Sequence, residues 1–405
     1  MINLEFVCDI ESAAGYAAHA RMMVKAFDRH SDLLTLSGIN IKVVSRRKEP
    51  NVVAFSDEER AIYEKYLNKD IGKVNARIFF EPTHFATFEE GVKTILFVQW
   101  ETTRIRDYAL NGDERRNWVS QMNKADLVMT SSGTARDAFQ ASGVTTPVVI
   151  NSGPIFENNP EVGQLGVAGL VMDQKTGSFL NVADRPIVIG YMAQWSPRKN
   201  IEAFIRDVTI AFNGNPNVVG LLKTYSGSKF NDDEAIVKAA KVVRESCKVA
   251  SPPDIYLVTE KLSDIGVEQF FNTIDIYYCP SRGEGFNVPA AMAAAAGVPV
   301  LVGKYGGHSE FLSPYNLLNG SFSPCIGMSA YDSNQFWFNI DEREAITRLR
   351  TLAMLRWNAR HGSEEKDFEM WNSLSKHTTE HALKVAGTQA FVSRFNEQIK
   401  KLFAA

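Results

Sequence analysis

The sequence has few cysteines, no long apolar run and no recognisable targeting segment. It contains only four cysteines, and they are scattered without a CxxC pair: Cys8, Cys247, Cys279 and Cys325. This distribution favours reduced thiols in the cytoplasm over a disulfide framework. No cysteine and histidine cluster has zinc-ligand spacing, so we expect no metal site. No apolar stretch approaches the ~20 residues that span a bilayer, and the N-terminus lacks the basic start of a signal peptide. We expect a cytoplasmic protein, at most peripheral to a membrane.

The sequence also lacks a strong charge of either sign. Lys and Arg number 44 against 47 Asp and Glu, which gives a formal net charge of -3. No overall basic field therefore exists to attract nucleic acid or an anionic membrane, although the net charge does not exclude local basic patches. The length of 405 residues exceeds what one hydrophobic core usually holds, so two domains are expected.

Short apolar runs alternate with amphipathic stretches along most of the chain, which predicts βαβ units and parallel sheets in an α/β fold. In the first half we expect strands at 2–7, 39–45, 76–80, 93–100, 126–131 and 147–151. In the second half we expect strands at 186–192, 218–224, 255–259, 276–279 and 298–302. Helical patterns are clearest at 17–30, 342–359 and 377–403.

A polar, glycine- and asparagine-rich segment at 157–184 separates the two series and is interpreted as a linker. We therefore divide the chain into an N-terminal domain (1–182), a C-terminal domain (183–375) and a terminal helix (376–405) that returns to the first domain.

The most informative segment is the glycine-rich stretch at 281–289, SRGEGFNVP, which follows a predicted buried strand. Its glycines allow the backbone to approach a ligand closely. Asn287 can cap the alanine-rich helix that follows, with Pro289 in its first turn. The free N–H groups of that helix suit a phosphate. The carboxylate of Glu284 can accept hydrogen bonds from sugar hydroxyls.

Residues 281–312, SRGEGFNVPAAMAAAAGVPVLVGKYGGHSEFL, resemble the signature of retaining glycosyltransferase family 4, roughly pSrxEGFGlpxlEAmAxGxPV followed by a gGxxE element. The segment at 190–204, GYMAQWSPRKNIEAF, resembles the strand, basic pair and helix upstream of that signature. The resemblance is strong over 186–311. It implies a GT-B fold of two facing Rossmann-like domains and a metal-independent, retaining transfer of a hexose or pentose. The donor would be a UDP-, GDP- or similar sugar, and no other cofactor is implied.

The resemblance also assigns roles to individual residues. Lys199 corresponds to the lysine at the donor diphosphate, and Glu284 to the glutamate at the donor sugar. With Arg198 they form the expected catalytic set. The residues expected to bind the donor are Gly15, Lys223, Gly285, Phe286, Asn287, Val288 and Glu310. For Glu310, capping of the next helix is the alternative.

Two positions depart from the pattern of the family. Met292 stands where a second glutamate would contact the ribose, and Gln194 or Ala193 takes the place of the arginine before Lys199. Arg198 or Lys223 can supply the missing charge. An active, divergent enzyme is our main hypothesis. The alternatives are an inactive sugar-nucleotide-binding or scaffold protein, and an epimerase or phosphorylase of the same architecture.

The acceptor cannot be identified from the sequence. His19, Trp100 and Glu101 are candidates on the acceptor side, although His19 can equally be a packing residue and Glu101 can pair with Arg104 or Arg106. A polysaccharide or lipid-linked glycan is the usual acceptor in the resembled family, and a modified DNA base is a minority alternative. A homo-oligomer also stays open.

Overall fold

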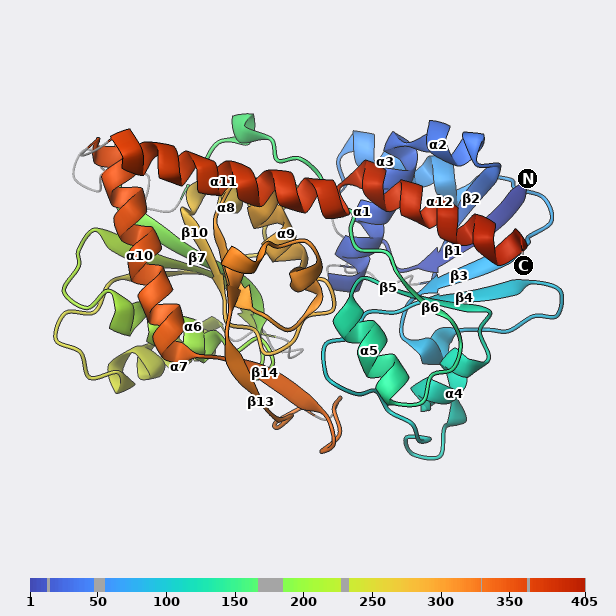
Figure 1. Cartoon of the computed structure of the whole chain (residues 1–405), viewed down its shortest axis with the longest axis horizontal. Coiled ribbons are helices and arrows are strands. Elements are labelled where there is room, and N and C mark those ends of the chain that lie inside the picture. The colour runs from blue at the N-terminus through green and yellow to red at the C-terminus, as the bar shows by residue number, and fades with distance from the viewer. Residues whose placement is uncertain are drawn as a thin grey trace.

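The computed structural model describes residues 1–12, 15–46, 55–166, 185–226, 233–328, 330–362 and 365–404. They form two α/β domains side by side, each built on a six-stranded parallel sheet flanked by helices (Figure 1). The α/β fold expected from the sequence is confirmed. Residues 167–184 of the expected linker lie outside the described residues, and so does the expected boundary between 182 and 183.

The first sheet has the order β2-β1-β3-β4-β5-β6, and all its pairs are parallel. Its strands lie at the six predicted places: β1 Ile2–Cys8, β2 Ile39–Ser45, β3 Ala76–Phe80, β4 Lys93–Phe97, β5 Leu127–Thr130 and β6 Val148–Ile150. Its helices are α1 Gly15–Arg29, α2 Ser31–Leu36, α3 Asp57–Leu67, α4 Trp118–Asn123 and α5 Gly133–Ala141. Short 3₁₀ turns are η1 Thr83–Phe85, η2 Glu114–Arg116 and η3 Pro160–Val162.

The second sheet has the order β12-β11-β10-β7-β8-β9. Its strands are β7 Ile187–Trp195, β8 Val218–Ser226, β9 Ile255–Val258, β10 Ile276–Cys279, β11 Val300–Gly303 and β12 Leu317–Leu318. Its helices and turns are α6 Ile201–Ala211, α7 Asp233–Ser246, α8 Asp264–Thr273, α9 Val288–Ala295, η4 Gly307–Glu310, η5 Pro314–Asn316 and α10 Glu342–His361. An antiparallel hairpin of β13 Gly320–Pro324 and β14 Phe336–Ile340 was not predicted.

Both faces of the first sheet are buried, as expected for parallel strands covered by helices. Neighbouring residues on one strand enter different cores: Phe6 packs with one group of apolar side chains and Val7 with another. Phe97 and Leu96 divide in the same way. The second sheet has one large core of its own. Each domain can therefore hold its strand ends in fixed positions, which matters for the site below.

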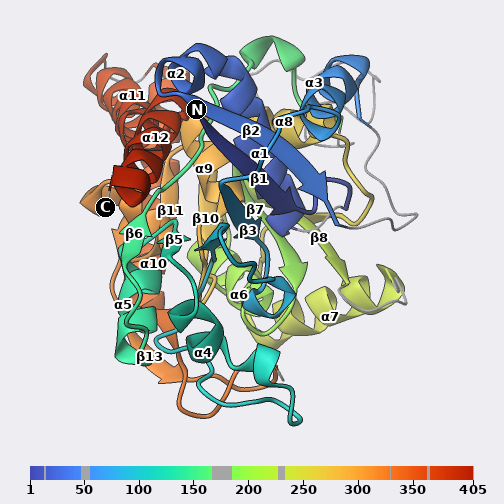
Figure 2. The same ribbon diagram turned by 90° about the vertical axis from the view of Figure 1, so that its right-hand side faces the viewer.

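Two crossings join the domains, and they lie against each other. Ile155 N–H donates to the carbonyl of Ala386 at 2.7 Å where the chain leaves the first domain. The long α11 Glu365–Ala386 runs along the second domain, and α12 Thr388–Ala404 continues onto the first (Figures 1 and 2). α12 buries Phe391 and Phe395 in the first core, which confirms the predicted return of the C-terminus.

The single helix predicted at 377–403 is two helices in the structure, separated at Gly387. Gly387 forms a bridge with Ile155 of the other crossing, and a Cβ at this position would overlap the carbonyl of Leu383. The break is thus imposed by a tertiary contact that the helical pattern does not reveal. Residues 376–386 belong to α11 on the second domain, and the return begins at Thr388. None of the described helices is long and apolar enough to cross a membrane.

Candidate functional site

The second sheet reverses its winding direction between β7 and β10. From β7 the chain adds β8 and β9 on one side, and it then adds β10, β11 and β12 on the other. In open α/β sheets, ligands bind outside the carboxyl ends of the strands at such a reversal. Arg198 and Lys199 follow the end of β7, and Glu284 follows the end of β10. The three predicted catalytic residues therefore meet at the place where this topology favours a site.

Their side chains form one compact ion cluster. Lys199 Nζ lies 2.6 and 2.8 Å from the two carboxylate oxygens of Glu284. Arg198 Nη1 lies 3.6 Å from Glu284 Oε2 and donates to the carbonyl of Gly283 at 2.6 Å. Burial raises the pKa of Glu284, which is only 5% exposed, but Lys199 and Arg198 outweigh burial and hold this pKa below its ordinary value. Glu284 is therefore ionised near neutral pH.

The turn after Glu284 leads into α9 through an unusual backbone conformation. Asn287 has a left-handed backbone with φ of 76°. Its side-chain oxygen accepts a hydrogen bond from Ala290 N–H at 3.3 Å, so it caps α9 as predicted. Val288 begins α9, and Met292 lies one turn later on the same helix. We call residues 281–287 the donor loop, after the role that the sequence predicts for them.

The first domain approaches the donor loop so closely that two positions must be glycine. A Cβ on Gly283 would overlap the carbonyl of Glu101, and a Cβ on Gly285 would lie 2.8 Å from Cβ of Gln99. Both partner residues follow β4 in the first domain. The two domains therefore contact each other beside the ion cluster.

Glu101 extends the ion cluster into the first domain. Its Oε1 lies 3.5 Å from Arg198 Nε and accepts a hydrogen bond from Tyr331 Oη. The arginines that the sequence offered as its partners contact other groups: Arg106, for example, pairs with Asp332 at 3.3 Å. Tyr331 and Asp332 lie in the segment between β13 and β14, which thus docks on the first domain.

His19 lies where the donor loop meets α1. Its ring stacks on Phe286 at a centroid distance of 4.6 Å and meets Phe80 edge-on at 5.3 Å. Its Nε2–H donates to the carbonyl of Gly153 at 2.7 Å. Burial lowers the pKa of His19 to about 4, although the bond to Gly153 opposes this shift, so the ring is neutral at physiological pH.

Trp100 lies mainly within the first domain. Its indole N–H donates to the carbonyl of Arg104 at 2.7 Å, and its ring packs on Trp118 with centroids 4.7 Å apart. Its one described aromatic contact to the second domain is with Tyr331, at 6.0 Å. Gly15 is the first residue of α1, and a Cβ there would meet no heavy atom within 4 Å.

Lys223 lies near the end of β8, the neighbour of β7. It is 7% exposed, and its ammonium lies 5.4 Å from the ring centroid of Tyr225. Burial lowers the pKa of Lys223, and the charges of Asp233 and Glu260 act in the opposite direction. Tyr225 is 41% exposed; partial burial raises the pKa of its hydroxyl, and the charge of Arg198 acts in the opposite direction. Tyr225 therefore lies beside Lys223 and within electrostatic range of Arg198.

Glu310 makes a contact that the sequence did not suggest. Its Oε1 accepts a hydrogen bond at 2.7 Å from the N–H of Gly133, the first residue of α5 in the other domain. Four further residues around the site were also missed: Tyr331, Gln99, Tyr16 and Ser131. Tyr16 Oη accepts from Gln99 N–H at 3.0 Å, and Gln99 Nε2 donates to Ser131 Oγ at 2.7 Å.

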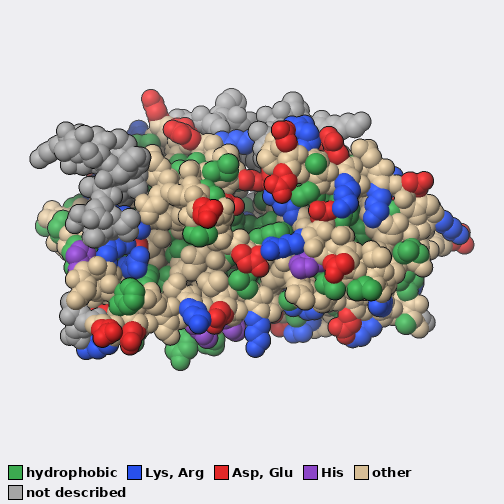
Figure 3. Space-filling view, turned by 90° about the horizontal axis from the view of Figure 1, so that it is seen from above, with side chains coloured by type: hydrophobic (Ala, Val, Ile, Leu, Met, Phe, Trp, Pro, Cys, Tyr) green, Lys and Arg blue, Asp and Glu red, His purple; other side chains and the backbone are tan. Residues whose placement is uncertain are grey.

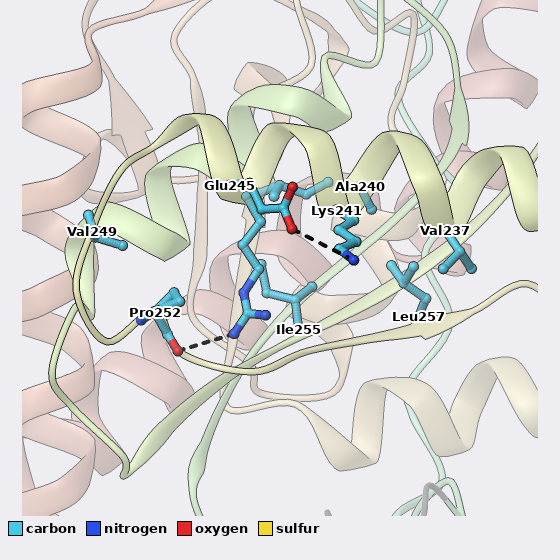
Figure 4. A pocket seen from close by; sticks show the side chains of 10 residues that line it. Val237, Ala240, Lys241, Glu245, Val249, Pro252, Ile255 and Leu257 are labelled. Carbon is cyan, nitrogen blue, oxygen red and sulfur yellow. Dashed lines mark hydrogen bonds and ion pairs between the residues drawn. The ribbon is translucent and has the colours of Figure 1, made fainter.

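A hollow of about 450 Å³ lies elsewhere, between α6, α7 and β9 (Figure 4). Its wall carries an ion pair of Lys241 with Glu245 and a hydrogen bond from Arg244 to the carbonyl of Pro252. None of the ion-cluster residues lines it. The hollow is therefore separate from the candidate site. Among the described residues, no group of three His, Cys, Asp or Glu side chains is arranged to hold a metal.

Comparisons with known proteins match part of the second domain by sequence and the whole chain by fold. Residues 186–320 match the family "Glycosyl transferases group 1", and no curated protein sequence matches. Sucrose-phosphate synthase of Thermosynechococcus elongatus is 14% identical with a TM-score of 0.61, and HepE of Anabaena, in complex with UDP and glucose, is 14% identical with a TM-score of 0.60. Each of these two alignments covers 100% of this chain and 100% of the other protein.

A TarM mutant of S. aureus, in complex with fondaparinux, alpha-GlcNAc-glycerol and UDP, is 12% identical with a TM-score of 0.52. That alignment covers 82% of this chain and 55% of TarM. At these identities the likeness establishes the fold. The chain therefore has the two-domain GT-B architecture, and its residues 186–320 carry the sequence pattern of the group 1 glycosyl transferases.

Proposed function

We propose that the protein is a retaining glycosyltransferase that moves a hexose or pentose from a nucleoside diphosphate to an acceptor, without a metal ion. The observation that carries the proposal is the buried cluster of Glu284, Lys199 and Arg198 at the topological reversal of the second sheet. This cluster lies within the segment that matches the group 1 glycosyl transferases.

The donor would lie across the strand ends of the second sheet. Polar groups follow the strand order, with Glu284 after β10, the basic pair after β7, and Tyr225 with Lys223 at the end of β8. Strands in a sheet lie about 4.8 Å apart, so these groups span roughly 10 Å. We assign the sugar to Glu284, the diphosphate to Arg198 and Lys199, and the base to the exposed ring of Tyr225.

The reaction breaks the bond between the anomeric carbon and the diphosphate, so negative charge develops on the leaving oxygen. Lys199, Arg198 and the free N–H groups at the start of α9 can stabilise this charge. The carboxylate oxygens of Glu284, which contact Lys199 in this structure, would accept a hydrogen bond from a hydroxyl of the donor sugar. Attack from the side of the leaving group would retain the configuration, and the departing phosphate would take the proton of the acceptor.

The acceptor would bind against the first domain, near Glu101 and His19, with Trp100 shaping the same loop. We favour a polysaccharide or a lipid-linked glycan. The formal net charge of -3 provides no overall basic field for the phosphate backbone of DNA. On the one face seen in Figure 3, acidic and basic side chains are likewise interspersed. A modified DNA base stays the minority acceptor.

A donor panel tests the proposal. Purified protein is incubated with UDP-, GDP- and ADP-sugars, with and without EDTA, and release of the nucleotide is measured. We expect slow release from one donor that EDTA does not prevent, and a loss of at least 100-fold in Glu284→Ala and Lys199→Ala. Glu245→Ala, in the wall of the separate hollow, is the matched control and should behave like the unchanged protein.

Two observations favour an inactive, nucleotide-sugar-binding protein as the second candidate. Met292 replaces a carboxylate that the resembled family uses, and Glu310 is engaged with Gly133. This candidate predicts that a donor binds with a micromolar dissociation constant while no nucleotide is released from it with any glycan or DNA acceptor. No binding of any donor would contradict both candidates.

A further inference from the structure

Asn287 occupies a left-handed backbone position that glycine adopts more readily. Its φ is 76°, and among residues with a side chain only a few, asparagine included, enter this region routinely. The resembled signature has glycine at this place. A side chain here needs partners of its own, because Asn287 is only 5% exposed.

Each polar atom of the Asn287 amide has a partner. Its oxygen accepts from Ala290 N–H at 3.3 Å, and its nitrogen lies 3.3 Å from His308 Nδ1 and 3.5 Å from Cys279 Sγ. Since the oxygen must face the backbone N–H of α9, the amide nitrogen must face His308. His308 Nδ1 therefore has to accept a hydrogen bond.

The other ring nitrogen of His308 fixes its tautomer. His308 Nε2 lies 2.6 Å from the carbonyl of Gly303, which can only accept, so the proton resides on Nε2. The ring is thus neutral and holds Asn287 with Nδ1. Next to it, Gly307 N–H donates to the carbonyl of Glu284 at 2.7 Å, so this turn supports the donor loop at two points.

The surroundings keep this ring neutral. His308 is 1% exposed, and burial lowers its pKa. The hydrogen bond to Gly303 and the carboxylate of Glu284 raise the pKa, and Lys199 lowers it. A proton on Nδ1 would place two N–H donors face to face. Asn287 could avoid this only by turning its amide and giving up the cap of α9.

We propose that His308 is a positioning residue, which holds the donor loop in its binding shape through Asn287 only while its ring is neutral. The inference rests on the proposed function, since the donor loop is the part that would face the sugar and the diphosphate. Under this proposal, acidification weakens donor binding by protonating His308, which does not itself contact the donor.

A double-mutant cycle tests the route through Asn287. KM for the donor and kcat are measured for the unchanged protein, His308→Ala, Asn287→Gly and the double variant. We expect His308→Ala to raise KM about tenfold, equivalent to about 1.4 kcal/mol, with kcat changed less than threefold. In the Asn287→Gly background the same change should raise KM less than threefold, because glycine needs no anchor. An equal rise in both backgrounds would overturn the proposal.

The pH dependence separates positioning from simple support of the fold. His308→Asn places an amide oxygen where Nδ1 lies and does not titrate. Because burial lowers the pKa of His308, the KM of this variant should rise less than that of the unchanged protein as the pH falls from 7.5 to 4.5. His381→Asn on α11 is the matched control and should keep the full rise. An identical acid dependence in all three proteins would contradict the proposal.

Nitrogen NMR of the histidine rings decides the geometry without a donor. We expect His308 as the Nε2–H tautomer at pH 7.5, with a pKa that changes in Asn287→Gly. An Nδ1–H tautomer would overturn the inference even if transfer is observed. If no donor binds, the proposed function fails, whereas the tautomer and the coupling to Asn287 can still be confirmed.

Discussion

Glu310 of the second domain accepts a hydrogen bond from the first N–H of α5 in the first domain, at Gly133. The distance is 2.7 Å, and the carboxylate lies at the positive end of the helix dipole. The same turn touches the donor loop through Gly307. A change at this contact therefore affects both the association of the domains and the site.

Replacing Glu310 with alanine should destabilise the closed arrangement of the domains. The loss of one carboxylate from a helix N-terminus costs about 1 kcal/mol, which corresponds to a fall in Tm of about 1–2 °C for a chain of 405 residues. Glu310→Gln keeps an acceptor oxygen and should lose less. Calorimetry measures both, with the exposed Glu90→Ala as control. A Glu310→Ala variant as stable as Glu90→Ala would show that the contact contributes nothing.

Gly285→Ala should weaken the approach of the domains. Its new Cβ would lie 2.8 Å from Cβ of Gln99, which is too close for two carbon atoms. We expect a larger radius of gyration in X-ray scattering and a donor KM raised by at least tenfold. Gly166→Ala, where a Cβ meets nothing within 4 Å, is the control. Unchanged scattering and an unchanged KM in Gly285→Ala would argue that the donor-bound protein does not use this contact.

His19 should make the stability of the protein depend on pH. Burial lowers its pKa to about 4 from about 6.5 in the unfolded chain, so the unfolded state binds a proton first as pH falls. The contribution of His19 is complete above pH 6.5 and is lost as pH falls toward 4. The total is about 3 kcal/mol.

Urea unfolding at pH 7.5 and pH 4.5 measures this contribution. His19→Phe retains an aromatic ring beside Phe286 and cannot titrate, so its free energy of unfolding should fall less between the two pH values than that of the unchanged protein. His361→Phe changes an exposed histidine and should keep the full fall. A His19→Phe variant that loses as much stability as the unchanged protein would contradict a buried, neutral His19.

The meeting of Glu284, Lys199 and Arg198 could be anticipated because each follows a strand of one parallel sheet. Local patterns locate strand ends well, and the carboxyl ends of neighbouring strands lie together. The turn at Asn287 and its cap on α9 were predicted on the same local grounds. The roles of these residues stay predictions.

Contacts between the domains could not be predicted, because nothing in the local sequence links segments that are far apart. Tyr331 reaches Glu101 across 230 positions, and Glu310 reaches Gly133 across 177. The break at Gly387 has the same origin, since it depends on Ile155 of the other crossing. The hairpin of β13 and β14 was not predicted either.

The most direct measurement is single-turnover release of nucleotide from the donor found in the panel, with EDTA present, by the unchanged protein, Glu284→Gln, Lys199→Met and the double variant. If the ion cluster is the catalytic centre, each single change should slow release at least 100-fold. The double variant should then be little slower than either, because the two residues act as a unit. Release at the original rate from Glu284→Gln, with Glu245→Ala also unchanged, would contradict the assignment of this site.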